Sequence, residues 1–202
     1  LVQLFRVVKH NPSSFAEQME LCLHSRKIYL DLFNKKNSGD HPVHEAQRAA
    51  RFFYLVRESF GHVRGRGWAF GKTNPARNWF DPDHLEAVHA RLKRVYIECL
   101  DFRKLIKIWD SKDTFFYLDP PYLSASGQRF YGSLEFSEKD LKDLAAILGR
   151  ISGKFLLSQP NDPEVKKLFH DFKISKTASI HYSLNQKRLT PRRRTELLIR
   201  KF

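Results

Sequence analysis

The chain has 202 residues, of which 42% are hydrophobic and 13% aromatic, so it can fold around a core and is not globally disordered. Its 36 Lys and Arg outnumber its 22 Asp and Glu, and the net charge of +14 indicates a polyanionic partner. No apolar run approaches the length of a membrane span, no signal peptide is visible, and Cys22 and Cys99 lie far apart. We therefore expect no membrane contact, no disulfide framework and a cytoplasmic location.

The first ninety residues have the apolar spacing of helices. Residues 1–8 predict one helix, and residues 15–23 predict a second after the Asn11-Pro12 break. The polar stretch 34–42 predicts a loop, and residues 46–60 predict a third amphipathic helix. Asp81 followed by Pro82 is typical of a helix start, so a further helix is expected there.

The second half changes to short, wholly apolar runs at residues 95–97, 115–118 and 155–157. Helical segments separate these runs, most clearly at residues 137–151. Continuous apolar strands alternating with helices predict an α/β doubly wound core, with a sheet buried on both faces. Residues 172–182 and 196–202, on either side of a basic turn, predict a terminal β-hairpin that closes the sheet.

Asp119, Pro120, Pro121 and Tyr122 directly follow the strand predicted at residues 115–118. Ligands of open α/β sheets bind outside the carboxyl ends of the strands, which is where this segment would lie. The amino group of a base is a poor nucleophile, and the Asp119 carboxylate and Pro120 carbonyl could accept its hydrogen bonds as positive charge develops. Tyr122 could stack on a base that has left its helix. The alternative is an ordinary turn with a packed aromatic ring.

These residues and their surroundings resemble the Dam-type DNA adenine methyltransferases, in which Asp-Pro-Pro-Tyr after an apolar strand is the catalytic motif. The resemblance implies a Rossmann-like class I methyltransferase core, S-adenosylmethionine as methyl donor, and transfer to the exocyclic N6 of adenine in a short duplex site. It covers nearly the whole chain in order, through LVQLFRVVKHNPSSFAEQM, RAARFFYLVRESFG, VYIECLDFRKLI, FFYLDPPYLSASGQRFYG, FSEKDLKDLAAIL, KFLLSQPND and RRRTELLIRKF.

The resemblance also implies site residues. Asp119, Pro120, Pro121 and Tyr122 would be catalytic, holding the target adenine. Asp101 and Phe102 match the family's site for the adenine ring of the cofactor, and Asp119 would contribute to the same pocket. Asp101 has a second interpretation as the N-cap of a following helix, and both roles are compatible.

Two basic segments are candidates for contact with DNA. Residues 61–80 match the family's target-recognition region, with glycines for close approach and Trp68, Phe70 and Trp79 as stacking or wedge groups. The alternatives are a solvated basic loop whose aromatics pack in the core and, near the C-terminus, a solvated edge protected by charge. The spacing Gly65-x-Gly67 follows a helix, so a dinucleotide loop is rejected. The candidate DNA-binding residues are Arg64, Arg66, Lys72 and Arg77 in the first segment, and Lys187, Arg188, Arg192, Arg193 and Arg194 in the second.

The family pattern places a glycine-rich loop, and an acidic residue for the cofactor ribose, just before the segment that matches Leu1. Neither lies within these 202 residues. We therefore expect Leu1 to follow a cut, either in the retained part of a longer protein or in a truncated fragment; a naturally degenerate relative is the third explanation. The expected division is residues 1–20 as the remainder of the N-terminal half, 21–92 as the recognition insert and 93–202 as the catalytic half.

The sequence thus predicts an S-adenosylmethionine-dependent DNA adenine methyltransferase that acts as a monomer on double-stranded DNA. The histidines near residue 42 lack metal-ligand spacing, so no metal is expected. One rival is a non-catalytic DNA-binding remnant of such an enzyme. Another keeps the chemistry but changes the substrate to cytosine or an RNA base, and a protein substrate fits the basic charge poorly.

Overall fold

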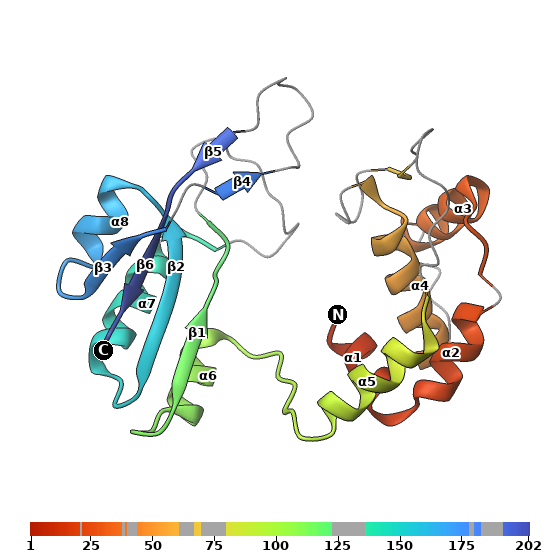
Figure 1. Cartoon of the computed structure of the whole chain (residues 1–202), viewed down its shortest axis with the longest axis horizontal. Coiled ribbons are helices and arrows are strands. Elements are labelled where there is room, and N and C mark those ends of the chain that lie inside the picture. Colours follow the sequence, from red (N-terminus) through yellow and green to blue (C-terminus); the bar gives the residue numbers. More distant parts are fainter. Residues whose placement is uncertain are drawn as a thin grey trace. The chain divides into compact units, whose positions relative to one another are not determined.

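The computed structural model describes residues 1–20, 22–37, 39, 44–60, 67–69, 80–122, 136–177, 180–182 and 192–202. The chain divides into two compact units, Leu1–Cys99 and Leu100–Phe202 (Figure 1). The first unit is helical and the second contains the sheet. The expected three-part division of the chain stays a prediction.

The described part of the first unit contains five helices. Asn11 ends the first helix and Pro12 begins the second, as predicted from the sequence. The Asp81 carboxylate accepts a hydrogen bond from the Asp83 N–H and caps the last helix, which also confirms the prediction. The helices are α1 (Val2–His10), α2 (Pro12–Glu20), α3 (Arg26–Asn37), α4 (Glu45–Arg57) and α5 (Pro82–Leu92).

Helix α3 was not predicted, and residues 34–37, which were expected to lie in a loop, continue this helix. Among the α3 side chains that the structure describes, Tyr29 alone is fully buried, while Leu32 and Phe33 pack partly against the same small cluster. An apolar stripe this narrow gives a weak helical periodicity in the sequence, which is why the helix was missed. The lysines and arginine of α3 have high helix propensity, which was the remaining signal for a helix.

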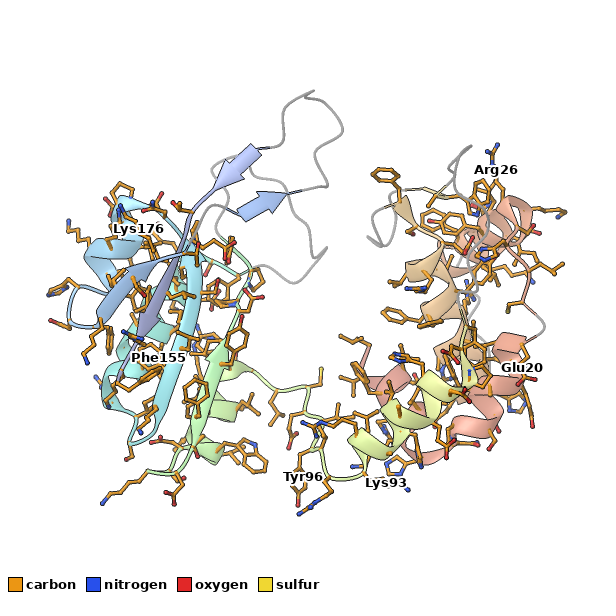
Figure 2. The ribbon with its side chains drawn as sticks, viewed as in Figure 1. Glu20, Arg26, Lys93, Tyr96, Phe155 and Lys176 are labelled. Carbon is orange, nitrogen blue, oxygen red and sulfur yellow. The ribbon has the colours of Figure 1, made fainter. Side chains whose placement is uncertain are left out.

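The strand predicted at residues 95–97 is absent, since this segment has neither helical nor strand structure. Val95 and Ile97 instead pack against the helical core of the first unit, and Tyr96 between them is 79% exposed (Figure 2). The Lys9 ammonium donates to the Val95 carbonyl at 2.8 Å. The prediction of a buried strand here was therefore wrong, since Val95 and Ile97 contact helices and the segment pairs with no strand in the described part of the chain.

The second unit contains a four-stranded sheet in the order β1-β2-β6-β3. β1 is parallel to β2, and β6 is antiparallel to both of its neighbours. A separate antiparallel pair, β4 with β5, extends from β3 and β6, so the predicted C-terminal hairpin is confirmed. The strands are β1 (Phe115–Leu118), β2 (Lys154–Pro160), β3 (Lys173–Lys176), β4 (Ile180–Tyr182), β5 (Arg192–Arg194) and β6 (Glu196–Arg200).

Helices α6 (Phe102–Trp109), α7 (Glu138–Arg150) and α8 (Pro163–Leu168) contribute to one core against this sheet. Phe155 of β2, labelled in Figure 2, is fully buried there, and so is Leu157. The predicted Rossmann-like α/β fold is therefore confirmed. On the opposite face Phe115 and Tyr117 are 53% and 64% exposed, so the burial expected for both faces does not extend to this part of β1. No helix in the described ranges is long and apolar enough to cross a membrane.

Candidate active site

The segment Asp119–Tyr122 leaves the carboxyl end of β1. Asp119 is exposed, and the next three residues are half-buried. Since β1 and β2 are parallel, their carboxyl ends meet at one edge, which is the edge where α/β sheets bind ligands. The predicted catalytic residues therefore lie at the sheet position that the sequence indicated.

The Tyr122 side chain is held by a hydrogen-bonded chain. Its hydroxyl lies 2.7 Å from Ser158 Oγ in β2, and Ser158 Oγ donates to Glu196 Oε2 in β6 at 3.2 Å. Burial is the main cause that raises the pKa of Tyr122 to about 12; the Ser158 hydrogen bond opposes the rise, and the Glu196 and Asp119 carboxylates add to it. The phenol is therefore neutral, and its hydroxyl is held by Ser158.

Sequence reasoning gave no role to Ser158, Gln159 or Glu196. Ser158 and Gln159 are buried, at 5% and 1% exposure, at the end of a strand whose other inner residues are apolar. Gln159 Nε2 has no hydrogen-bond partner in the described part of the chain. The same sequence feature that identified Asp119 also marks Ser158 and Gln159: polar side chains at the carboxyl end of an apolar strand, where α/β sheets bind ligands.

Asp101 and Phe102 begin α6, which precedes β1 and therefore starts near the carboxyl edge of the sheet. Asp101 Oδ1 accepts a hydrogen bond from the Arg103 N–H at 2.9 Å, which confirms its interpretation as the N-cap of α6. The Phe102 ring lies 6.0 Å from the Phe136 ring, and the Arg103 guanidinium lies 4.3 Å from the Phe102 centroid. The Asp101 carboxylate is nevertheless 47% exposed, so a role in binding remains compatible with its role as a cap.

The basic candidates are less well covered. Residues Arg64, Arg66, Lys72, Arg77, Lys187 and Arg188 lie outside the described residues, as do Phe70 and Trp79. The backbone of residues 192–194, which include the predicted Arg192, Arg193 and Arg194, forms β5. β5 continues through one residue into β6, which begins at Glu196. The basic strand β5 thus lies two residues before Glu196, which belongs to the hydrogen-bond chain that reaches Tyr122.

Trp68, the described aromatic residue of the recognition segment, is anchored in the first unit. Its Nε1–H donates to Glu58 Oε2 at 3.0 Å, and the Arg26 guanidinium lies 4.9 Å from its ring centroid. Glu58 is 5% exposed and also contacts His24 Nδ1 at 2.8 Å. Trp68 therefore serves as an anchor for this segment, as the alternative interpretation expected. The backbone on either side of it is held as well, because the Phe60 N–H donates to the Gly67 carbonyl and the Ala69 N–H donates to the Glu58 carbonyl.

Metal-binding chemistry has no candidate here. Across the described residues, no group of three or more His, Cys, Asp or Glu side chains is placed to hold an ion. The arrangement at the carboxyl edge instead offers carboxylates, a buried amide and aromatic rings, which suit an organic ligand.

Comparison with known proteins points the same way as the motif. A family model described as D12 class N6 adenine-specific DNA methyltransferase matches residues 1–181. This range includes all of the first unit, most of the second, the segment Asp119–Tyr122, and β1 to β3. A search of curated proteins found no match.

Proposed function

Since this chain belongs to the D12 class of N6 adenine-specific DNA methyltransferases, we propose that Asp119–Tyr122 is its catalytic segment. The enzyme methylates the N6 amino group of adenine in DNA, and neither a binding remnant nor a cytosine or RNA methyltransferase has support. The observation that carries the proposal is the position of Asp119 at the carboxyl end of β1, exposed and followed by two prolines.

We assign the hydrogen-bond acceptors to Asp119 and Pro120. The Asp119 carboxylate and the Pro120 carbonyl oxygen accept the two N–H bonds of the adenine amino group, which favours the pyramidal, positively charged nitrogen of the transition state. When the nitrogen becomes alkylated it loses one proton, and Asp119 Oδ is placed to hold it. Because the Asp119 side chain is exposed, that proton passes on to water.

Tyr122 supplies the surface for the base. An adenine within a duplex cannot reach a carboxylate at a strand end, so it must leave its stack and be held elsewhere. The half-buried Tyr122 ring, next in the chain to Pro121, offers an aromatic face for that purpose. Its neutral hydroxyl is engaged by Ser158 and does not compete for the amino group.

S-adenosylmethionine supplies an electrophilic methyl group on a sulfonium ion when bound. The residues at the carboxyl edge fit such a ligand, because Asp101 and Asp119 are exposed carboxylates and Gln159 Nε2 is a buried donor without a partner in the described part of the chain. We propose that Asp101 and Phe102 contact its adenine ring, as the resemblance implies, and that Asp119 lies beside its charged end.

The DNA is proposed to be double-stranded and bound by one copy of the chain. The net charge of +14 supports backbone contacts, and the Arg192–Arg194 strand and the segment containing Arg64, Arg66, Lys72 and Arg77 are the proposed phosphate-binding residues. If they contact phosphates, affinity falls steeply as salt is raised.

The test is Asp119→Ala, with Asp113→Ala as a matched control. Asp113 is an exposed aspartate in the turn before β1, at the opposite end of the same strand. We expect Asp119→Ala to lower methyl transfer to plasmid DNA, prepared from a host without adenine methylation, by about 100-fold or more. DNA affinity and the activity of the control should stay within about two-fold of the parent. Equal activity of Asp119→Ala and its parent would contradict the catalytic assignment.

A further inference from the structure

We propose that Ser158 and Glu196 are positioning residues that hold Tyr122 for stacking on the target adenine, through two consecutive hydrogen bonds from the last strand of the sheet. The inference rests on the role proposed above for Tyr122. It assigns a function to two residues that carry none in the motif itself.

Three segments bring these side chains to one face of the sheet. Tyr122 follows β1, Ser158 lies in β2, and Glu196 begins β6. Successive strand residues point to opposite faces, so Ser158 points away from the helix-covered core that buries Leu157. Ser158 is paired with Leu198, two residues beyond Glu196. Ser158 and Glu196 are therefore diagonal neighbours on the same face.

The direction of the chain of hydrogen bonds follows from its last member. A carboxylate oxygen only accepts, so Ser158 must donate its hydroxyl proton to Glu196. The Ser158 oxygen is then left as an acceptor for the Tyr122 hydroxyl at 2.7 Å. Because Ser158 is only 5% exposed, water competes poorly for either bond.

Glu196, the last member of this hydrogen-bond chain, is held in place by hydrogen bonds of its own backbone. The Glu196 N–H donates to Thr177 Oγ1 at 2.9 Å, and the Thr177 N–H donates to the Glu196 carbonyl at 2.9 Å. Asn161 Nδ2 donates to Thr195 Oγ1 at 2.9 Å, which holds the preceding residue as well. The Tyr122 ring is thus restrained at its hydroxyl by residues of β2 and β6. A stacking surface ordered before the base arrives avoids the entropy loss of ordering it during catalysis.

The proposal is tested with Tyr122→Phe, Ser158→Ala and Glu196→Ala, and with the double variant Tyr122→Phe/Ser158→Ala. The conservative variant is Glu196→Gln, whose side-chain oxygen can still accept from Ser158. Ser175→Ala is the matched control, since Ser175 lies in β3 of the same sheet and bonds to the Leu198 carbonyl, not to Tyr122. Single-turnover methylation of the same unmethylated plasmid DNA is measured with DNA affinity and the unfolding midpoint.

We expect each of the three single substitutions to lower the methylation rate by about 5- to 10-fold, as the loss of one net hydrogen bond implies, with DNA affinity unchanged within about two-fold. Glu196→Gln should recover most of the Glu196→Ala loss, and Ser175→Ala should have no effect. The double variant should be no slower than Tyr122→Phe alone, because both changes break one chain.

Losses that multiply in the double variant, or a normal rate in Ser158→Ala, would overturn the positioning role. Asp119→Ala is measured alongside to separate the two proposals. If it is inactive while the double variant shows multiplied losses, the catalytic segment stands and the positioning role fails. If Asp119→Ala is fully active, the proposed catalytic function itself fails.

Discussion

Arg103 in α6 donates two hydrogen bonds to the Asp143 carboxylate in α7, from Nε at 3.0 Å and from Nη2 at 2.6 Å. The same guanidinium bonds to Asp140 in the first turn of α7 at 2.5 Å and to the Asp101 cap at 3.1 Å. One cation therefore joins the beginnings of two helices that precede β1 and β2. Because the first turns of α6 and α7 lie near the carboxyl edge of the sheet, these ion pairs stabilise the helix ends beside the proposed active site.

Arg103→Ala should lower the unfolding midpoint of the protein, because three carboxylates lose their shared partner. Lys104→Ala, which removes an exposed cation from the next position of α6, is the control. Thermal unfolding at neutral pH measures both. Equal midpoints for the two variants would show that this cluster contributes nothing to stability.

The same variant predicts a pH dependence. Arg103 and the Ser137 cap hold the pKa of Asp140 far below its ordinary value of 3.8. A carboxyl whose pKa is lowered by folding stabilises the folded state above the unfolded pKa, and this contribution is lost as the pH falls towards the folded pKa. We therefore expect the difference in stability between the parent and Arg103→Ala to be constant above about pH 5 and to shrink below about pH 4. Urea unfolding of both proteins across this range measures the difference, and a difference that persists in acid would contradict the assignment.

Tyr122 predicts the opposite dependence in alkali. Its pKa of about 12, which Tyr54 in the first unit shares, lies above the ordinary value of 10. The unfolded chain loses these protons first as the pH rises, so the contribution of the two tyrosines to stability should be constant below about pH 10 and should fall between about pH 10 and 12. Tyr122→Phe should reduce that fall and remove one proton from the late part of the tyrosinate absorbance titration. Tyr96→Phe, at a side chain that is 79% exposed, is the control variant.

Two glycines of the second unit should respond to alanine in opposite ways. A Cβ at the buried Gly153 would lie 2.7 Å from the Thr114 carbonyl oxygen and 2.9 Å from that of Ser111, and neither backbone atom can move freely. Gly153→Ala should destabilise the protein by about 1–3 kcal/mol. Gly149 is an exposed position of α7 with no atom within 4 Å of its Cβ site, so Gly149→Ala should stabilise by about 0.5–1 kcal/mol. Urea unfolding distinguishes the two, and a destabilised Gly149→Ala would contradict the reasoning.

The sequence predicted the elements that local chemistry dictates. The Ser137–Asp140 capping box starts α7, and the apolar run 115–118 forms β1, because a cap and a buried strand each depend on neighbouring residues. The segment Asp119–Tyr122, the proposed catalytic segment, was identified for the same reason. Ser158 and Glu196 were not, since they reach Tyr122 only after strands distant in sequence pair in a particular register. The segment 95–97 was misassigned because its partner is a helical core, and periodicity alone does not identify the partner.

Gln159 should show a conflict between stability and function. Its amide is 1% exposed, and its Nε2 donor has no partner in the described part of the chain, although it lies next to Ser158 at the carboxyl end of β2. An unpaired buried amide destabilises a fold, so Gln159→Met, which keeps the volume and removes the amide, should stabilise the protein by about 1–3 kcal/mol. If the donor is kept for a bound molecule, the same change should weaken binding of S-adenosylmethionine by about 5-fold or more.

Calorimetric titration with S-adenosylmethionine and thermal unfolding measure these two effects of Gln159→Met separately. Gln18→Met, at a position on the helical unit, is the control for introducing the thioether. A higher unfolding midpoint with weaker binding supports Gln159 as a ligand donor. A lower midpoint with unchanged affinity would show that the Gln159 amide stabilises the fold and does not bind the ligand, which would contradict both expectations.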